Sequence, residues 1–245
     1  MDAMEPAVTD SISKFDARAD EYAVQSRIAL AGYDACHELS ACLLAARLGR
    51  ERHADLLIAG AGGTAQEILT TARLAPHWRY TAVDPSGPML DRARGNVAAS
   101  GLGGRVRFHQ GRVEDLPATE LFAAATLIGV LHHLPGQEAK HAILAALAAR
   151  LEPGAPLVLA GNRGAYASRP LFLSAWAERW RLHGADDGEV EAKLGKIRHG
   201  AEPPASDAAV VALLEHAGFE AAELFFSSLF WGAWIATRAA RLKRP

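Results

Sequence analysis

Hydrophobic residues follow two different spacings along this chain of 245 residues. In the central part, short apolar runs alternate with segments whose apolar residues recur at helical spacing. The apolar runs are DLLIAG, RYTAVD, VRFHQG, LFAAATLIGVL and PLVLAG. Short strands that alternate with helices of about 10–15 residues indicate βαβ units and a parallel sheet.

Helical spacing also predicts elements before and after this central part. SISKFDARADEYAVQ reads as an amphipathic helix, and a second helix follows Gly32 and ends near Gly49. The end of the chain has two strand-like stretches around Ser227-Ser228, which predict a hairpin at the sheet edge. We therefore divide the chain into a tail, an N-terminal helical lid, and an α/β domain with a helical insert: residues 1–10, 11–50, 51–245 and, for the insert, about 165–217.

Composition narrows the function classes. Hydrophobic residues make up 50% and the net charge is −2, so the basic excess that drives binding to a phosphate backbone is missing and a nucleic-acid partner is not expected. Cys36 and Cys42 suit neither a short-range disulfide nor a metal clip. No apolar run reaches the length of a membrane span, and the first residues lack the apolar region of a signal peptide. We expect a cytoplasmic protein with no membrane partner and no metal.

Candidate chemistry begins where the first strand ends. The strand runs into Gly60, Ala61 and Gly62 and then into a helix, whose N-terminus favours an anion. The second strand ends at Asp84, where a carboxylate can accept hydrogen bonds from a ribose diol. An adenosine-type ligand across the strand ends is therefore the leading hypothesis. The loop is also compatible with a dinucleotide, or with a tight turn that binds nothing.

Five segments in order resemble the motifs of class I S-adenosylmethionine-dependent methyltransferases. They are LLIAGAGGTAQEIL, YTAVDPSGPMLDRAR, VRFHQGRVEDLP, TLIGVLHHLP and LEPGAPLVLAG. The resemblance implies a Rossmann-like α/β fold with a seven-stranded, mostly parallel sheet of order 3-2-1-4-5-7-6. It also implies S-adenosylmethionine as cofactor. A nicotinamide dinucleotide in the loop then becomes a minor hypothesis.

The two ends of the chain resemble one branch more closely. AGYDACHEL and HAGFEAAELFFSSLFWGAWIATR look like the carboxy-S-adenosylmethionine synthase that serves tRNA wobble-uridine modification. That resemblance suggests a homodimer. It also implies cofactor contacts at Tyr33, Gly60, Ala61, Gly62, Asp84, Pro85, Arg112, Val113 and Ile128.

Several positions depart from these patterns. Arg112 stands where the family usually has an acid that accepts from the adenine, so either Glu114 or Asp115 substitutes or only the Val113 backbone contacts the adenine. Ile58 and Thr64 replace an acid and a glycine of the first motif. The synthase-like branch has an asparagine at Ile128, and its carboxylate-gripping arginine aligns near Gly195, with Lys193 and Lys196 as the nearby cations. We therefore expect ordinary S-adenosylmethionine and methyl transfer to a small molecule. The alternatives are the carboxylated cofactor and a non-catalytic binding relative.

Methyl transfer is an in-line displacement that depends mainly on positioning the donor and acceptor. An acceptor that carries a proton benefits from a base, and His132 and His133 follow the fourth strand, where the ligand crevice is expected. Their alternative role is packing or capping beside Pro135. Aromatic residues could cover the cofactor or wall the acceptor, or could simply form core: Phe15, Tyr22, Phe172, Trp176, Trp180, Phe226, Trp231 and Trp234.

Overall fold

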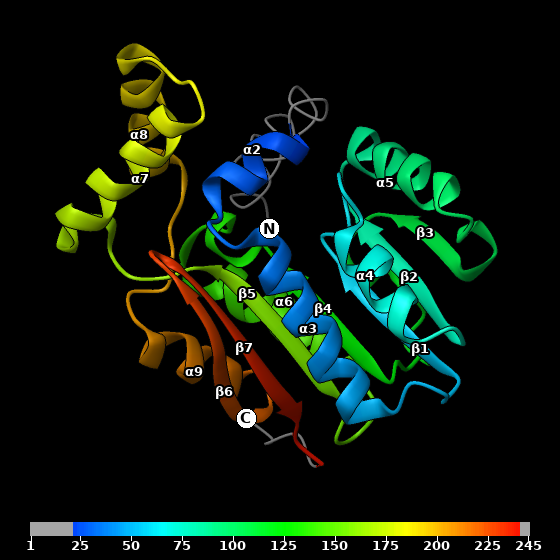
Figure 1. Cartoon of the computed structure of the whole chain (residues 1–245). Coiled ribbons are helices and arrows are strands. Elements are labelled where there is room, and N and C mark those ends of the chain that lie inside the picture. The colour runs from blue at the N-terminus through cyan, green and yellow to red at the C-terminus, as the bar shows by residue number, and fades with distance from the viewer. Residues whose placement is uncertain (1–21, 241–245) are drawn as a thin grey trace.

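A single twisted sheet organises the computed structural model, which describes residues 22–240 (Figure 1). Its seven strands have the order β3-β2-β1-β4-β5-β7-β6. All neighbours are parallel except β7, which runs antiparallel to β5 and to β6. The predicted fold class is thus confirmed. The strands are β1 (Ala54–Ala59), β2 (Trp78–Asp84), β3 (Val106–Gln110), β4 (Ala124–Ile128), β5 (Pro156–Asn162), β6 (Phe219–Ser228) and β7 (Trp231–Arg238).

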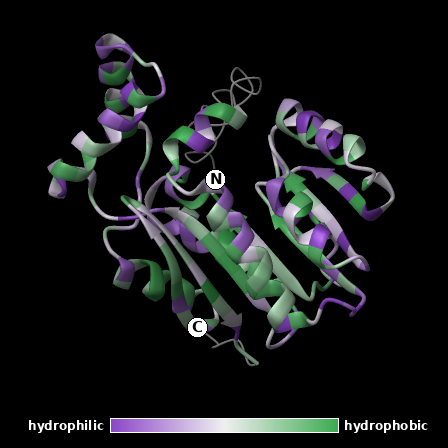
Figure 2. Cartoon of the chain, viewed as in Figure 1, coloured by the Kyte–Doolittle hydropathy of each residue, from purple (hydrophilic) through white to green (hydrophobic). Residues whose placement is uncertain are grey.

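Helices cover both faces of this sheet. On one face the buried residues of α3, α4 and α5 form a core with alternate residues of the central strands, and on the other face α6 and α9 do the same. Figure 2 shows that the central strands are mostly apolar, as expected for a parallel sheet buried on both faces. The helices of these layers are α3 (Tyr33–Leu48), α4 (Gln66–Leu74), α5 (Gly87–Ala99), α6 (Gly136–Ala149) and α9 (Asp207–His216).

The strand order reverses between β1 and β4, which lie side by side at the middle of the sheet. Ala59 is level with Val83 of β2 and with Leu127 of β4, so the carboxyl ends of these three strands lie at one edge. In open α/β sheets, ligands bind outside such a reversal point. The predicted site residues of three separate motifs therefore meet here.

The first two helices of the insert pack against the N-terminal helix, whereas its third helix, α9, packs on the sheet. Helices α2 (Tyr22–Ala29), α7 (Pro170–Leu182) and α8 (Asp187–Gly200) share a small core that includes Ile28, Trp176, Trp180 and Phe230. The Trp176 and Trp180 rings stack with centroids 5.4 Å apart. These residues are buried against one another, so the structure assigns them to the core rather than to an open pocket wall.

Short 3-10 turns complete the chain between the main elements. They are η1 (Gly103–Arg105), η2 (Val113–Asp115), η3 (Leu131–His133) and η4 (Tyr166–Ser168). The predicted hairpin is present, but its turn lies at Leu229 and Phe230, just beyond Ser228. The first predicted helix is described only from Tyr22 onward. The proposed tail and Phe15 lie outside the described residues.

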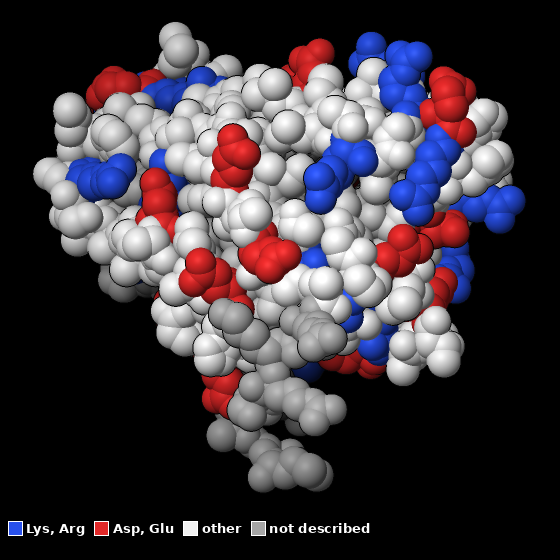
Figure 3. Space-filling view, turned by 90° about the horizontal axis from the view of Figure 1, so that it is seen from below, with Lys and Arg blue, Asp and Glu red and all other residues white. Residues whose placement is uncertain are grey.

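Basic and acidic side chains are interspersed on the face drawn in Figure 3, so neither sign of charge dominates that face. Within residues 22–240, no helix is both long and apolar enough to cross a bilayer.

Candidate functional site

The glycine loop after β1 is hydrogen-bonded to the end of β2. The Gly60 and Ala61 N–H groups both donate to the Val83 carbonyl, at 2.8 and 3.2 Å. Gly60 has a φ of 69°, and a Cβ there would lie 2.2 Å from the Val130 Cγ2 atom. Glycine is thus required at this position for two reasons, a left-handed backbone and a close neighbour.

Asp84 fastens the loop from the end of β2. Its Oδ2 atom accepts from the Gly62 N–H at 3.0 Å, and its Oδ1 atom accepts from the Ser86 N–H at 2.9 Å. A Cβ on Gly62 would meet the Asp84 Oδ2 atom at 2.6 Å. The exposed Pro85 follows, and Ser86 then caps α5 by accepting from the Met89 N–H at 3.3 Å. A carboxylate oxygen can accept more than one hydrogen bond, so the ribose role expected of Asp84 is compatible with this geometry.

Tyr33 reaches the same loop from the start of α3. Its hydroxyl lies 2.8 Å from the Thr64 Oγ1 atom, and both residues are buried. The Arg27 guanidinium of α2 lies 4.7 Å from the centre of the Tyr33 ring. Thr64, which replaces a glycine of the family pattern, therefore connects the N-terminal helices to the loop. Ile58, the other departure in this motif, is fully buried in the core beneath α3.

The predicted adenine contacts lie at the end of β3. Val113 is buried and Arg112 is exposed. The Arg112 N–H donates to the Asp115 Oδ2 atom at 2.7 Å, so this carboxylate is engaged with the backbone. The Glu114 side chain is exposed, which leaves Glu114 as the carboxylate outside that backbone bond. Ile128 is buried at the end of β4, next to the loop.

The two histidines after β4 have different environments. His132 is 4% exposed, whereas His133 is only partly buried. The Asn162 N–H donates to the His132 Nδ1 atom at 3.3 Å, so in the neutral ring Nε2 carries the proton. Burial, helped by the nearby charges of His133 and Lys140, holds the pKa of His132 well below its usual range.

A loop of the insert binds the segment that contains His132. The Glu202 N–H donates to the His132 carbonyl at 2.8 Å, and the Glu202 carboxylate accepts from the Gly136 N–H at 2.8 Å. Lys140 is 2% exposed and donates to the Leu134 and Gly136 carbonyls. Burial lowers the pKa of Lys140, and the charge of Glu202 opposes that shift. Sequence reasoning missed these contacts of Glu202, because residues 200–204 (GAEPP) read only as an interruption between helices.

Asn162 and Trp231 also belong to this region. Asn162 ends β5, and Trp231 starts β7 directly opposite it in the antiparallel register. The Trp231 ring makes an edge contact with His132, with centroids 5.5 Å apart. Sequence reasoning treated Trp231 as wall or core and did not single out Asn162, because their pairing depends on strand register.

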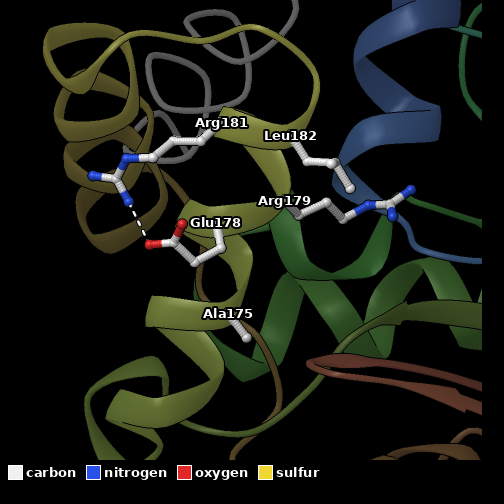
Figure 4. A pocket seen from close by; sticks show the side chains of 5 residues that line it. All are labelled: Ala175, Glu178, Arg179, Arg181 and Leu182. Atoms are coloured by element: carbon white, nitrogen blue, oxygen red, sulfur yellow. Dashed lines mark hydrogen bonds and ion pairs between the residues drawn. The ribbon is translucent and has the colours of Figure 1, made fainter.

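One surface hollow lies elsewhere, on α7. Ala175, Glu178, Arg179, Arg181 and Leu182 line it (Figure 4). Its charged groups bind other protein groups: Arg181 pairs with Glu178 at 2.7 Å, and Arg179 donates to two carbonyls at the end of α2. None of the predicted site residues lines this hollow.

In the part of the chain that the structure describes, no three His, Cys, Asp or Glu side chains are grouped so that they could hold an ion. Cys36 is buried, and burial raises the pKa of its thiol to about 12, whereas Cys42 is exposed.

Comparison with known families gives one match. Residues 57–154 match the family described as "Methyltransferase domain". This segment runs from β1 to just before β5 and contains the glycine loop, Asp84, Val113 and His132. The match supports an S-adenosylmethionine-dependent methyltransferase. No curated protein matches the sequence.

Solved structures show the same fold at low sequence identity. An O-methyltransferase family 2 protein from Planctomyces limnophilus, in complex with apigenin, has a TM-score of 0.66 and 16% identity, with 97% of this chain and 63% of that chain covered. A possible exported protein from Bordetella parapertussis gives 0.62 and 18%, covering 83% and 67%. The S-adenosylmethionine-dependent methyltransferase SibL gives 0.57 and 20%, covering 85% and 57%. The chain spans between 55% and 67% of the length of the first four such structures.

Proposed function

We propose that this protein transfers a methyl group from S-adenosylmethionine to a small-molecule acceptor. The observation that carries the proposal is the fastening of the glycine loop by Asp84 at the reversal point of the sheet, within the segment that matches the methyltransferase family. Small residues there let a ligand approach the backbone, and the carboxylate stands where a ribose diol would be bound.

We assign the predicted cofactor residues the following contacts around this point. Gly60, Ala61 and Gly62 would receive the methionine end, with Tyr33 covering it from α3. Asp84 and Pro85 would hold the ribose. Arg112 and Val113 would flank the adenine, and Ile128 would contact the sulfonium side. S-adenosylmethionine supplies an already activated methyl group, so the protein has to orient the two partners and exclude water.

The different environments of the two histidines favour different roles for them. The Nδ1 lone pair of His132 is engaged by the Asn162 N–H, so His132 orients its surroundings as a neutral donor at Nε2. His133 is partly exposed beside it and is the better candidate for a base. A base of this kind speeds proton removal from an alcohol, phenol or amine by roughly 10²–10⁴-fold.

The carboxylated cofactor gains no supporting observation. Lys193, one of the cations near the aligned position, donates to the Gln25 side chain of α2 at 2.9 Å and so contacts the N-terminal helix. Lys196 is exposed on α8. A homodimer and a cytoplasmic location remain predictions from the sequence.

Calorimetric titration with S-adenosylhomocysteine tests the cofactor site. Asp84→Asn should weaken binding by about 10–100-fold, because a charge-assisted hydrogen bond is worth about 1.5–3 kcal/mol. Asp91→Asn is the matched control, since Asp91 lies exposed on α5 and pairs with Arg94 at the surface. Equal affinity of the wild type and the Asp84 variant would contradict the proposed site.

Catalysis is tested separately. Wild-type protein, S-adenosylmethionine with a deuterated methyl group and a panel of small phenols, alcohols and amines should give products heavier by the transferred group. The same panel with His133→Gln should give a reaction slowed by roughly 10²-fold or more if His133 is the base. A wild type that binds the cofactor and methylates nothing in the panel would favour the non-catalytic alternative.

A further inference from the structure

Two unpaired polar atoms lie on the neighbouring strands β5 and β7, close to His132. Within residues 22–240, the Asn162 Oδ1 and Trp231 Nε1 atoms are buried and have no hydrogen-bond partner. Asn162 is 8% exposed, and Trp231 is partly buried. Most buried polar atoms in native proteins are paired, so an unpaired acceptor and an unpaired donor on residues opposed across two strands need an explanation.

These two side chains are neighbours in space. Asn162 and Trp231 are directly opposed across the antiparallel β5–β7 pair, so their Cβ atoms lie on one face at about 4.5–5.5 Å. His132 lies against both residues, since its Nδ1 atom accepts from the Asn162 backbone N–H at 3.3 Å and its ring contacts the Trp231 ring. The Asn162 Nδ2 atom donates to the Tyr166 hydroxyl at 2.9 Å, which fixes the amide and leaves Oδ1 as its free atom.

The pair also lies close to the carboxyl end of β4. A Cβ on Gly129 would be 3.6 Å from the Trp231 ring, and Gly129 directly follows Ile128 at the end of β4. The unpaired atoms are therefore on the side of β4 away from the glycine loop, between that strand and the edge of the sheet.

We propose that Asn162 and Trp231 form a binding subsite for a neutral group that both donates and accepts a hydrogen bond. A hydroxyl or a carboxamide meets this requirement: its hydrogen pairs with Asn162 Oδ1 and its oxygen accepts from Trp231 Nε1–H. A carboxylate offers only acceptors and is repelled by Asn162 Oδ1. The apolar ring of Trp231 favours an aromatic body attached to that group. The inference rests on the proposed function, because it takes the occupant to be the methyl acceptor.

Four probes with the same ring separate these chemistries: phenol, benzamide, benzoate and toluene. Ligand-observed NMR titration of the full chain, with and without S-adenosylhomocysteine, measures the affinity of each. Phenol and benzamide should bind at least about tenfold more tightly than benzoate and toluene, because unpaired buried polar groups penalise a ligand that cannot pair them.

Variants assign the binding to the two side chains. Trp231→Phe and Asn162→Leu should each weaken phenol binding about tenfold or more, while changing toluene binding little. Trp78→Phe is the matched control: Trp78 is fully buried with an unpaired Nε1 atom, but it lies at the amino end of β2. Circular dichroism and thermal unfolding establish that each variant is folded, and if one is not, the other decides the question.

The proposal is overturned if toluene binds the wild type as well as phenol does, if both folded variants bind phenol like the wild type, or if no probe binds up to about 10 mM. The first result would mean that an internal water satisfies the pair. Probe binding without S-adenosylhomocysteine binding would leave the subsite standing and count against methyl transfer. Binding of S-adenosylhomocysteine without binding of any probe would contradict the subsite and leave the proposed methyl transfer standing.

Discussion

Gly60 offers the sharpest test of how the loop is built. Replacing it with alanine puts a side chain on a residue with a φ of 69° and places the new Cβ 2.2 Å from the Val130 Cγ2 atom. The left-handed backbone costs a non-glycine residue about 1–2 kcal/mol. Forcing an extra methyl into a packed contact costs about 1–3 kcal/mol more.

Gly60→Ala should therefore lower the free energy of unfolding by about 2–5 kcal/mol and the melting temperature by about 4–20 °C. Urea and thermal unfolding of the wild type and variant measure this. Gly95→Ala is the control, because Gly95 lies exposed in α5 and a Cβ there would meet no atom of the described residues within 4 Å. This control should stabilise the protein by about 0.5–1 kcal/mol, since alanine is favoured over glycine inside a helix.

A double-mutant cycle separates the two costs. In Gly60→Ala with Val130→Ala, the nearest remaining Val130 atom is its Cβ, 3.7 Å from the new methyl, which is ordinary contact. The double variant should be about 1–3 kcal/mol more stable than the sum of the single effects predicts. Additive effects, or a Gly60→Ala protein as stable as the wild type, would refute the role of Val130 in excluding a side chain here.

The remaining predictions concern buried titratable groups. His132→Asn keeps an acceptor for the Asn162 N–H but cannot titrate. Because burial lowers the pKa of His132, the free energy of unfolding of the wild type should fall as the pH drops below about 6.5. Urea titrations at several pH values should show that the variant loses less stability over the same range. Lys140→Met leaves two carbonyls without their donor and should cost about 2–4 kcal/mol in the same unfolding assay; an unchanged midpoint would contradict a structural role for the ammonium. A thiol reagent at pH 8 should label Cys42 within minutes and leave Cys36 unlabelled until unfolding, because burial raises the pKa of Cys36 to about 12, and mass spectrometry of the peptides distinguishes the two.

Local patterns were enough to predict a parallel sheet, whereas its strand order came from the resemblance to class I methyltransferases. Alternating strand and helix spacing indicated parallel pairing, and glycine followed by a helix marked the loop at the end of β1. The hairpin turn was misplaced by a residue or two because Ser227-Ser228 resembles turn chemistry. The true turn at Leu229 and Phe230 is set by tertiary packing, since Phe230 is fully buried in the core shared by α2 and α7.

Single motifs predicted individual site residues, but not the contacts between residues of different motifs. The sequence presents His132 and His133 as equivalent neighbours, and only the fold buries one against Asn162 and leaves the other partly exposed. The link between Asp84 and Gly62 depends on the strands ending level. Contacts between Asn162 and Trp231 depend on cross-strand register, which spacing along the chain does not encode.

The most direct test of the central claim is thermal unfolding of the wild-type protein with S-adenosylmethionine, S-adenosylhomocysteine or NAD. At about 100 times the Kd, a ligand of the native state adds about 2.7 kcal/mol, which raises the melting temperature of a protein this size by roughly 5–10 °C. We predict this shift with the first two ligands and none with NAD. A shift with NAD alone, or no shift with any of them in protein that mass spectrometry shows to be ligand-free, would contradict the assignment of the loop and Asp84 to S-adenosylmethionine.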